Sequence, residues 1–193
     1  MCEIITTPNP VLIKTAEPVI KFDRKLHLLI KDMEQTLLAT VDPVGVGLAA
    51  PQVGVSLRIF QMKPTEKAKV TTYINPIINK VSEEEEIPTS TNSEKIEHRK
   101  PGESKGKLLE GCLSIPNIWG NVTRKKELTL SWQDEFGVEH SKDFTEFPAV
   151  IVQHEMDHLN GILFTTHVIS QGEKLYKSHK NEQGEDEFDE IKL

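Results

Sequence analysis

The sequence contains few cysteines and no long apolar run. Its two cysteines, Cys2 and Cys112, could form at most one disulfide, and a single bridge to the second residue is unpromising for a secreted chain. No apolar run approaches the roughly 20 residues that span a bilayer. The N-terminus lacks a basic segment followed by an apolar one, so no signal peptide is expected. These absences predict a protein of the reducing cytoplasm that does not contact a membrane.

Positive charge is also scarce, because 23 Lys and Arg residues face 30 Asp and Glu residues, giving a net charge of −7. Phosphate contact needs clustered Lys and Arg, so we expect no direct nucleic-acid binding. The hydrophobic fraction of 37% is enough for a core, and 193 residues fit one domain. A single domain is therefore expected. The oligomeric state stays open at this point, with a monomer favoured.

Apolar spacing and turn-forming residues predict a mixed α+β fold. Prolines favour an extended N-terminal arm over residues 4–19. Apolar residues at helical spacing follow a candidate N-cap, Asp23, which predicts a helix to about Thr40. A second helix should begin after Thr145 and stop at Gly161. Strand-like runs occupy residues 57–61, 71–74, 128–132 and 138–144.

Two segments are too polar to belong to a core. Residues 82–107 open with an acidic run, Glu83 to Glu86, and predict a long charged loop insertion in contact with solvent. Residues 173–193 predict a polar acidic tail, in which residues 181–184 could turn a weak hairpin. The expected organisation is a domain over residues 1–172, with the insertion at 82–107, followed by the tail.

The strongest local motif is the sequence HEMDH at residues 154–158, inside the second predicted helix. Helix positions four apart lie on one face, roughly 6 Å from each other, so His154 and His158 can bind one cation together. Glu155 can then reach a metal-bound water. Two unrelated histidines are the alternative, but the apolar residues 149–152 indicate a buried helix, where unpaired His and Glu are costly. The motif favours metal-assisted hydrolysis.

No downstream residue completes the ligand set, because Phe164 stands where one metalloprotease group has a third histidine. Upstream, Cys112 follows Gly111, and a thiolate is a good ligand for iron or zinc. A lone cysteine is more often an inert core residue, so its role stays open at this point. Residues 45–52 contain two glycines that allow close backbone approach and end in Gln52, whose amide can donate to an oxyanion, although a small-residue turn explains them equally well.

Taken together, residues 45–52, 110–114 and 153–161 resemble the three signature motifs of bacterial peptide deformylases, in the family's order. The similarity extends from the N-terminal arm to about Val168. It implies antiparallel or mixed sheets around a central metal-binding helix, plus an N-terminal helix. It also implies a hydrolase of protein biosynthesis that removes the N-formyl group from the N-terminal methionine of newly made peptides.

The same resemblance implies one divalent metal ion. Ferrous iron is the ion expected in the cell, and zinc and nickel also suit the ligands. Glu155 would take a proton from the metal-bound water and later deliver it to the departing amine. The Gln52 side chain and the Leu113 backbone amide would donate to the oxyanion. The implied metal ligands are Cys112, His154 and His158, and the residues that could orient them are Glu110, Arg124 and Asp157.

The substrate is expected to lie extended along Val46, Gly47 and Gly111, pairing like an added strand. Trp119 departs from the more typical family pattern at a substrate-side position. The acidic tail disfavours docking on ribosomal RNA, so any contact with the ribosome should be transient. The pocket for the methionine side chain is assigned to Val46, Leu108, Phe147, Val150 and Ile151, although a buried helix needs apolar residues at 147–151 in any case.

Three alternatives remain. A general HExxH metallopeptidase would explain residues 154–158 but gives Cys112 and Gln52 no role. A non-catalytic metal-binding domain would tolerate replacement of Glu155, whereas an enzyme should lose most of its rate. A cysteine hydrolase using Cys112 as nucleophile would remain active after chelation of metal, which the deformylase interpretation forbids.

Overall fold

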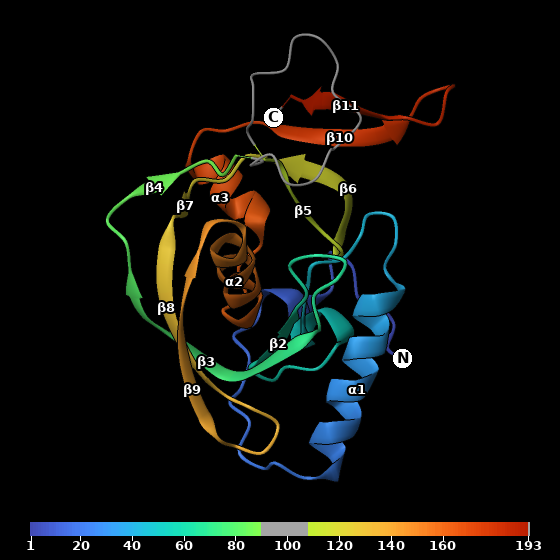
Figure 1. Ribbon diagram of the computed structural model, residues 1–193. Helices are drawn as coiled ribbons and strands as arrows, with labels where there is room; N and C mark the ends of the chain where they lie inside the picture. The colour runs from blue at the N-terminus through green and yellow to red at the C-terminus, as the bar shows by residue number, and fades with distance from the viewer. Residues whose placement is uncertain (90–107, 193) are drawn as a thin grey trace.

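Helix α2 (Glu146–Leu159) lies at the centre of the fold, with strands of the two larger sheets around it (Figure 1). The computed structural model describes residues 1–89 and 108–192. α2 is apolar along most of its length and buries Val150, Val152 and Leu159. The chain leaves it through Gly161, whose φ of 71° suits glycine. A Cβ there would lie 2.7 Å from the Ile13 carbonyl carbon, so the helix end also requires a glycine.

The N-terminal helix α1 (Arg24–Ala39) begins and ends as its sequence predicts. The Asp23 side chain accepts hydrogen bonds from the backbone N–H groups of Lys25 and Leu26. Its apolar face, which includes Met33 and Leu37, packs against Leu48, Ile59 and Ile74. α1 therefore covers the sheet on the side away from α2 (Figure 1).

A five-stranded antiparallel sheet wraps around α2. Side chains from its strands, among them Phe60 and Tyr73, share the main core cluster with Ile151, Val152 and Met156 of the helix. β1 has only one strand neighbour and is an edge of this sheet. The order is β1 (Gly47–Ala49), β2 (Ile59–Met62), β3 (Thr71–Val81), β8 (Glu127–Gln133) and β9 (Glu139–Thr145).

A second, four-stranded antiparallel sheet carries the C-terminal residues. Its order is β11 (Asp186–Ile191), β10 (Leu175–Lys180), β6 (Ile115–Gly120) and β5 (Glu110–Cys112), so β5 is an edge strand. One face packs on α3 (Phe164–Ser170), a helix that the sequence did not predict. The tail is thus a regular hairpin, β10–β11, joined to the sheet through β6 (Figure 1).

Two expectations about irregular segments need correction. The N-terminal arm is not extended throughout, because Asn9 caps a short 3-10 helix, η1 (Pro10–Ile13). The acidic run at 83–86 is exposed but not simply solvated. β4 (Glu85–Glu86) pairs with β7 (Arg124–Lys125), and carboxylates of the run form ion pairs with Lys125 and Lys126. Residues 90–107 of the predicted insertion lie outside the described residues. None of the described helices is long and apolar enough to cross a membrane.

Candidate metal centre and substrate pocket

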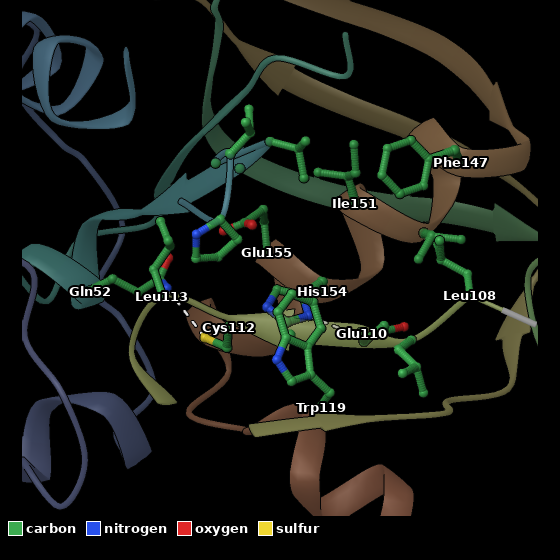
Figure 2. Close-up of a pocket in the computed structure, with 18 residues that line it drawn as sticks. Gln52, Leu108, Glu110, Cys112, Leu113, Trp119, Phe147, Ile151, His154 and Glu155 are labelled. Atoms are coloured by element: carbon green, nitrogen blue, oxygen red, sulfur yellow. Dashed lines mark hydrogen bonds and ion pairs between the residues drawn. The ribbon is translucent and has the colours of Figure 1, made fainter. Parts of the chain in front are cut away.

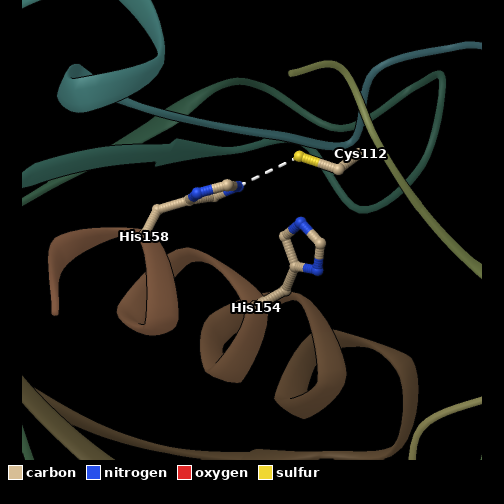
Figure 3. A group of neighbouring side chains, drawn as sticks. All are labelled: Cys112, His154 and His158. Carbon is tan, nitrogen blue, oxygen red and sulfur yellow. Dashed lines mark hydrogen bonds between the residues drawn. The ribbon is translucent and has the colours of Figure 1, made fainter. Parts of the chain in front are cut away.

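Three ligand atoms of the types predicted from the sequence converge on one point (Figure 3). Cys112 Sγ and one imidazole nitrogen from each of His154 and His158 all lie within 4.8 Å of one another. Sγ is 3.2 Å from Nε2 of His158, and the two imidazole rings are 5.0 Å apart. α2 supplies both histidines one turn apart, and the end of β5 supplies the cysteine. One thiolate and two imidazoles form a ligand set suited to zinc or iron.

The charges around Cys112 favour the form of cysteine that binds metals. Burial by itself raises the pKa of the Cys112 thiol, but the charge on His158 and hydrogen bonds from His154 and His158 lower it well below its usual range. Burial likewise lowers the pKa of His154, while Cys112 and Glu110 raise it overall. A thiolate facing positive charge is the arrangement that a bound cation also stabilises.

Glu155 provides an independent test of whether a cation fits here. Its side chain is 3% exposed, and Oε2 has no hydrogen-bond partner among the described residues. Burial raises the pKa of this carboxyl to about 7. A buried carboxylate without a partner is costly, and it becomes reasonable beside a cation and its attacking water. The donor set and this carboxylate both fit a divalent metal.

A chain of ion pairs fixes the orientation of His154. Glu110 Oε2 lies 3.1 Å from Nδ1 of His154, which leaves Nε2 for a cation. Arg124 donates hydrogen bonds of 2.8 and 2.9 Å to the two carboxylate oxygens of Glu110. It donates a third, of 2.7 Å, to the carboxylate of Asp157. Burial raises the pKa of Glu110, but Arg124 and His154 outweigh it and lower the pKa to about 2. The structure therefore joins all three predicted orienting residues into one network.

Replacing Glu110 by glutamine should weaken metal binding by roughly 10–100-fold, the usual effect of losing the partner of a ligating histidine. Glutamine keeps the shape of the side chain but removes the charge that Arg124 and His154 face. Competition with a chromogenic chelator measures the affinity. Glu127→Gln, at an exposed position on β8, is the control and should bind metal normally. An unchanged affinity in folded Glu110→Gln protein would contradict the orienting role.

A cavity of about 350 Å³ is lined by Cys112 and His154, two of the three convergent residues (Figure 2). Its wall also includes Gln52, Leu113 and Glu155, the residues expected to take part in the chemistry. The cavity is lined by Gly47 of β1 and by the residues of β5, and each of these strands is an edge strand among the described residues. All seven residues predicted to bind substrate line it: Val46, Gly47, Leu108, Gly111, Phe147, Val150 and Ile151.

The Gln52 side chain has a fixed orientation. Its Oε1 accepts a 2.8 Å hydrogen bond from the backbone N–H of Ala49, so the NH₂ group must point the other way. That Nε2 lies 3.3 Å from Ser114 Oγ. It also lies 3.5 Å from Cys112 Sγ (Figure 2). The short 3-10 helix η2 (Ala50–Val53) places Gln52 here, 2% exposed. The Gln52 amide is thus held as a hydrogen-bond donor next to the three convergent ligand residues.

Sequence reasoning did not assign roles to two residues that the structure brings into the site. Ser114 is fully buried and receives the Gln52 amide, and its place two residues after Cys112 was the available signal. Trp119 lines the cavity and lies against Gly111, where an added Cβ would come within 2.7 Å of the indole. Gly111 is therefore in close contact with Trp119.

These features define a metal-dependent hydrolase: a buried HExxH helix, a convergent cysteine, and a carboxylate oxygen with no partner among the described residues beside an apolar cavity. The sequence profile of the polypeptide deformylase family matches residues 1–174. The chain belongs to this family. It accordingly removes the N-formyl group from the N-terminal methionine of newly made peptides. The predictions of family, fold class and activity are confirmed.

Individual relatives agree with this assignment. The peptide deformylase of Pseudothermotoga lettingae is 41% identical over 81% of this chain and 76% of its own. The Campylobacter jejuni enzyme is 35% identical over 94% of this chain and 98% of its own. The crystal structure of the Thermotoga maritima peptide deformylase superposes with a TM-score of 0.71 at 34% identity, covering 86% of this chain and 97% of that one.

Proposed function

We propose that residues 1–172 form the catalytic domain and deformylate peptides with a divalent ion held by Cys112, His154 and His158. The observation that carries this proposal is the buried Glu155 carboxylate, which lines the substrate cavity next to the three ligand atoms and has no protein partner on Oε2 within the described residues. A structural metal site has no use for such a group, because desolvating it costs free energy. A hydrolase needs it as a base.

Glu155 handles the protons of the reaction. A bound divalent ion supplies a Lewis acid that polarises the formyl carbonyl and makes the attacking water more acidic. Glu155 removes one proton from that water as its oxygen bonds to the formyl carbon. It then delivers the proton to the amine nitrogen as the C–N bond breaks. The products are formate and a peptide with a free N-terminal methionine.

Gln52 and Leu113 stabilise the negative charge that develops on the carbonyl oxygen. The Gln52 amide is locked by Ala49 and Ser114, so its donor is in place before the reaction begins. The backbone N–H of Leu113 is the second donor, and Leu113 lines the same cavity. Donors fixed in advance cost no reorganisation in the transition state.

Replacing Gln52 by leucine should lower kcat by about 100-fold, since a lost oxyanion donor costs roughly 3 kcal/mol in the barrier. KM should change little, because the donor acts mainly on the transition state. Gln61→Leu is the matched control: Gln61 is equally buried but bonds to Ile30 and Thr72, away from the cavity. If both variants lose stability and only Gln52→Leu loses kcat, the role holds. Equal kcat values would exclude it.

The peptide lies extended between the edge strands β1 and β5 and pairs with backbone at Val46, Gly47 and Gly111. The methionine side chain occupies the apolar part of the cavity. Burial of an unbranched side chain of this kind contributes about 1.5–3 kcal/mol to binding. The residues that receive it are Val46, Leu108, Phe147, Val150 and Ile151.

Ferrous iron is the proposed ion in the cell, and zinc and nickel suit the same Cys and His₂ ligands. We further propose a cytoplasmic monomer whose contact with the ribosome is transient, because the acidic C-terminal residues repel RNA. The test is formate release from a formyl-Met tripeptide by protein purified without oxygen, then stripped and reloaded with each metal. Activity that chelation removes and iron restores is expected. Cleavage of the unformylated peptide, or activity after complete chelation, would overturn the proposal.

A further inference from the structure

The C-terminal hairpin, β10–β11, contacts Trp119, a residue that lines the substrate cavity. The indole Nε1 of Trp119 donates a 3.0 Å hydrogen bond to Ser178 Oγ on β10. Its ring meets Phe188 of β11 edge-on, with the centroids 6.0 Å apart and the planes at 81°. Ser178 and Phe188 are cross-strand partners, so both project from the same face of the sheet as the indole. The hairpin follows residue 174, where the match to the family profile ends.

The face of this sheet opposite Trp119 is buried against α3. The indole lies on the other face, where Ser178 and Phe188 of the hairpin contact it. A Cβ at Gly120, the next residue of β6, would lie 2.7 Å from Val168 of α3, so that side is already filled. The indole extends across Gly111 of β5 and reaches the cavity (Figure 2). One side of the indole ring packs against Gly111, and Ser178 and Phe188 of the hairpin contact the ring elsewhere. The hairpin therefore fixes the position of the Trp119 side chain in the cavity wall.

We propose that Trp119 determines specificity for the residues that follow the formylated methionine, and that the β10–β11 hairpin is a positioning element that fixes the indole through Ser178 and Phe188. This inference rests on the proposed path of the peptide along β5. A substrate strand that pairs near Gly111 passes the indole with its next one or two side chains. Apolar and aromatic side chains gain contact with the ring, whereas acidic ones gain none.

The substrate class that follows is formyl-Met peptides with an apolar residue in the second or third position. A formyl-Met amide, which ends before the indole, should be insensitive to it. The effect should appear in KM, because the contact is the same in the ground state and the transition state. Trp119 lines the cavity but is neither one of the convergent ligand residues nor one of the proposed oxyanion donors, so its replacement should affect KM more than kcat.

The test compares Trp119→Ala, Phe188→Ala and Ser178→Ala on formyl-Met amide and on formyl-Met-X-Ser peptides with X as alanine, leucine, phenylalanine or aspartate. Trp119→Ala should raise KM for the leucine and phenylalanine peptides by about 3- to 10-fold, the scale of one lost aromatic contact. Phe188→Ala should give part of this rise in KM. The double variant Trp119→Ala with Phe188→Ala should show no larger rise than Trp119→Ala alone. Lys177→Ala, on the other face of β10, is the control and should match the wild type.

A fluorescence readout separates positioning from chemistry. In a Trp132→Phe background, Trp119 is the single tryptophan, so its emission should shift in Phe188→Ala and change when a leucine peptide binds. Unchanged emission and KM in Phe188→Ala would overturn the role of the hairpin. Equal losses on formyl-Met amide and on the peptides would overturn the role in specificity. Wild-type activity on the tripeptide is measured first, so a failure of the proposed function is recognised independently of these variants.

Discussion

Replacing Glu155 by glutamine should lower kcat by about 10²- to 10⁴-fold, the usual contribution of a positioned general base. Glutamine has the same shape but cannot accept the proton of the attacking water. Glu155 is not one of the three convergent ligands, so metal content should be retained. The variant should also unfold at a temperature no lower than the wild type, because the change removes a buried carboxyl whose Oε2 has no described protein partner.

Three measurements on the same preparation distinguish the explanations: kcat on a formyl-Met tripeptide, bound metal by elemental analysis, and thermal unfolding. Glu146→Gln is the matched control, since Glu146 is an exposed carboxylate on the same helix. It should behave as the wild type in all three. Loss of metal together with activity would mean that Glu155 supports the metal site instead of acting as the base. Retained activity would move the base to another residue.

The two long helices, α1 and α2, could be predicted from the sequence because their determinants are local. Asp23 and the apolar spacing after it specify α1, and the apolar run before His154 indicates that α2 is buried. The sheets could not be predicted in the same way. β10 finds its partner β6 far away in the chain, and the short pair β4–β7 depends on where Lys125 is held. Such pairing is decided by tertiary packing rather than by local preference.

The residues of the site likewise divide into those that local sequence predicts and those that only tertiary packing brings together. The spacing of His154 and His158 follows from helix geometry, so two of the three convergent ligand residues are visible in one motif. Cys112 could be added only through resemblance to a family, because nothing local distinguishes it from a core cysteine. The contact between Gln52 and Ser114, and the hold of Phe188 on Trp119, join residues that no pattern connects. These contacts exist only after the sheets have formed.

Replacing Gly47 by alanine should reduce kcat almost as severely as the loss of Glu155, by about 100-fold or more. A Cβ on Gly47 would collide with Oε1 of Glu155 and would lie 2.7 Å from the carboxyl carbon. Gly47 belongs to β1 in the core-facing sheet and Glu155 to the central helix, so neither backbone can retreat easily. The flexible carboxylate must therefore move, and the proton acceptor leaves its working position.

The double variant Gly47→Ala with Glu155→Ala tests this cause directly. If the added methyl group acts only by displacing the carboxylate, the double variant should be no slower than Glu155→Ala alone, since contacting residues are not additive. Gly45→Ala is the comparison, because its Cβ would press on Leu37 of α1 and on Thr40, the residue after the helix, instead. It should lower the free energy of unfolding while leaving kcat within a few-fold of the wild type. A further loss of kcat in the double variant would show that Gly47 also acts through the backbone contacts proposed for the substrate. The structural requirement for glycine would then come from both the base and the peptide.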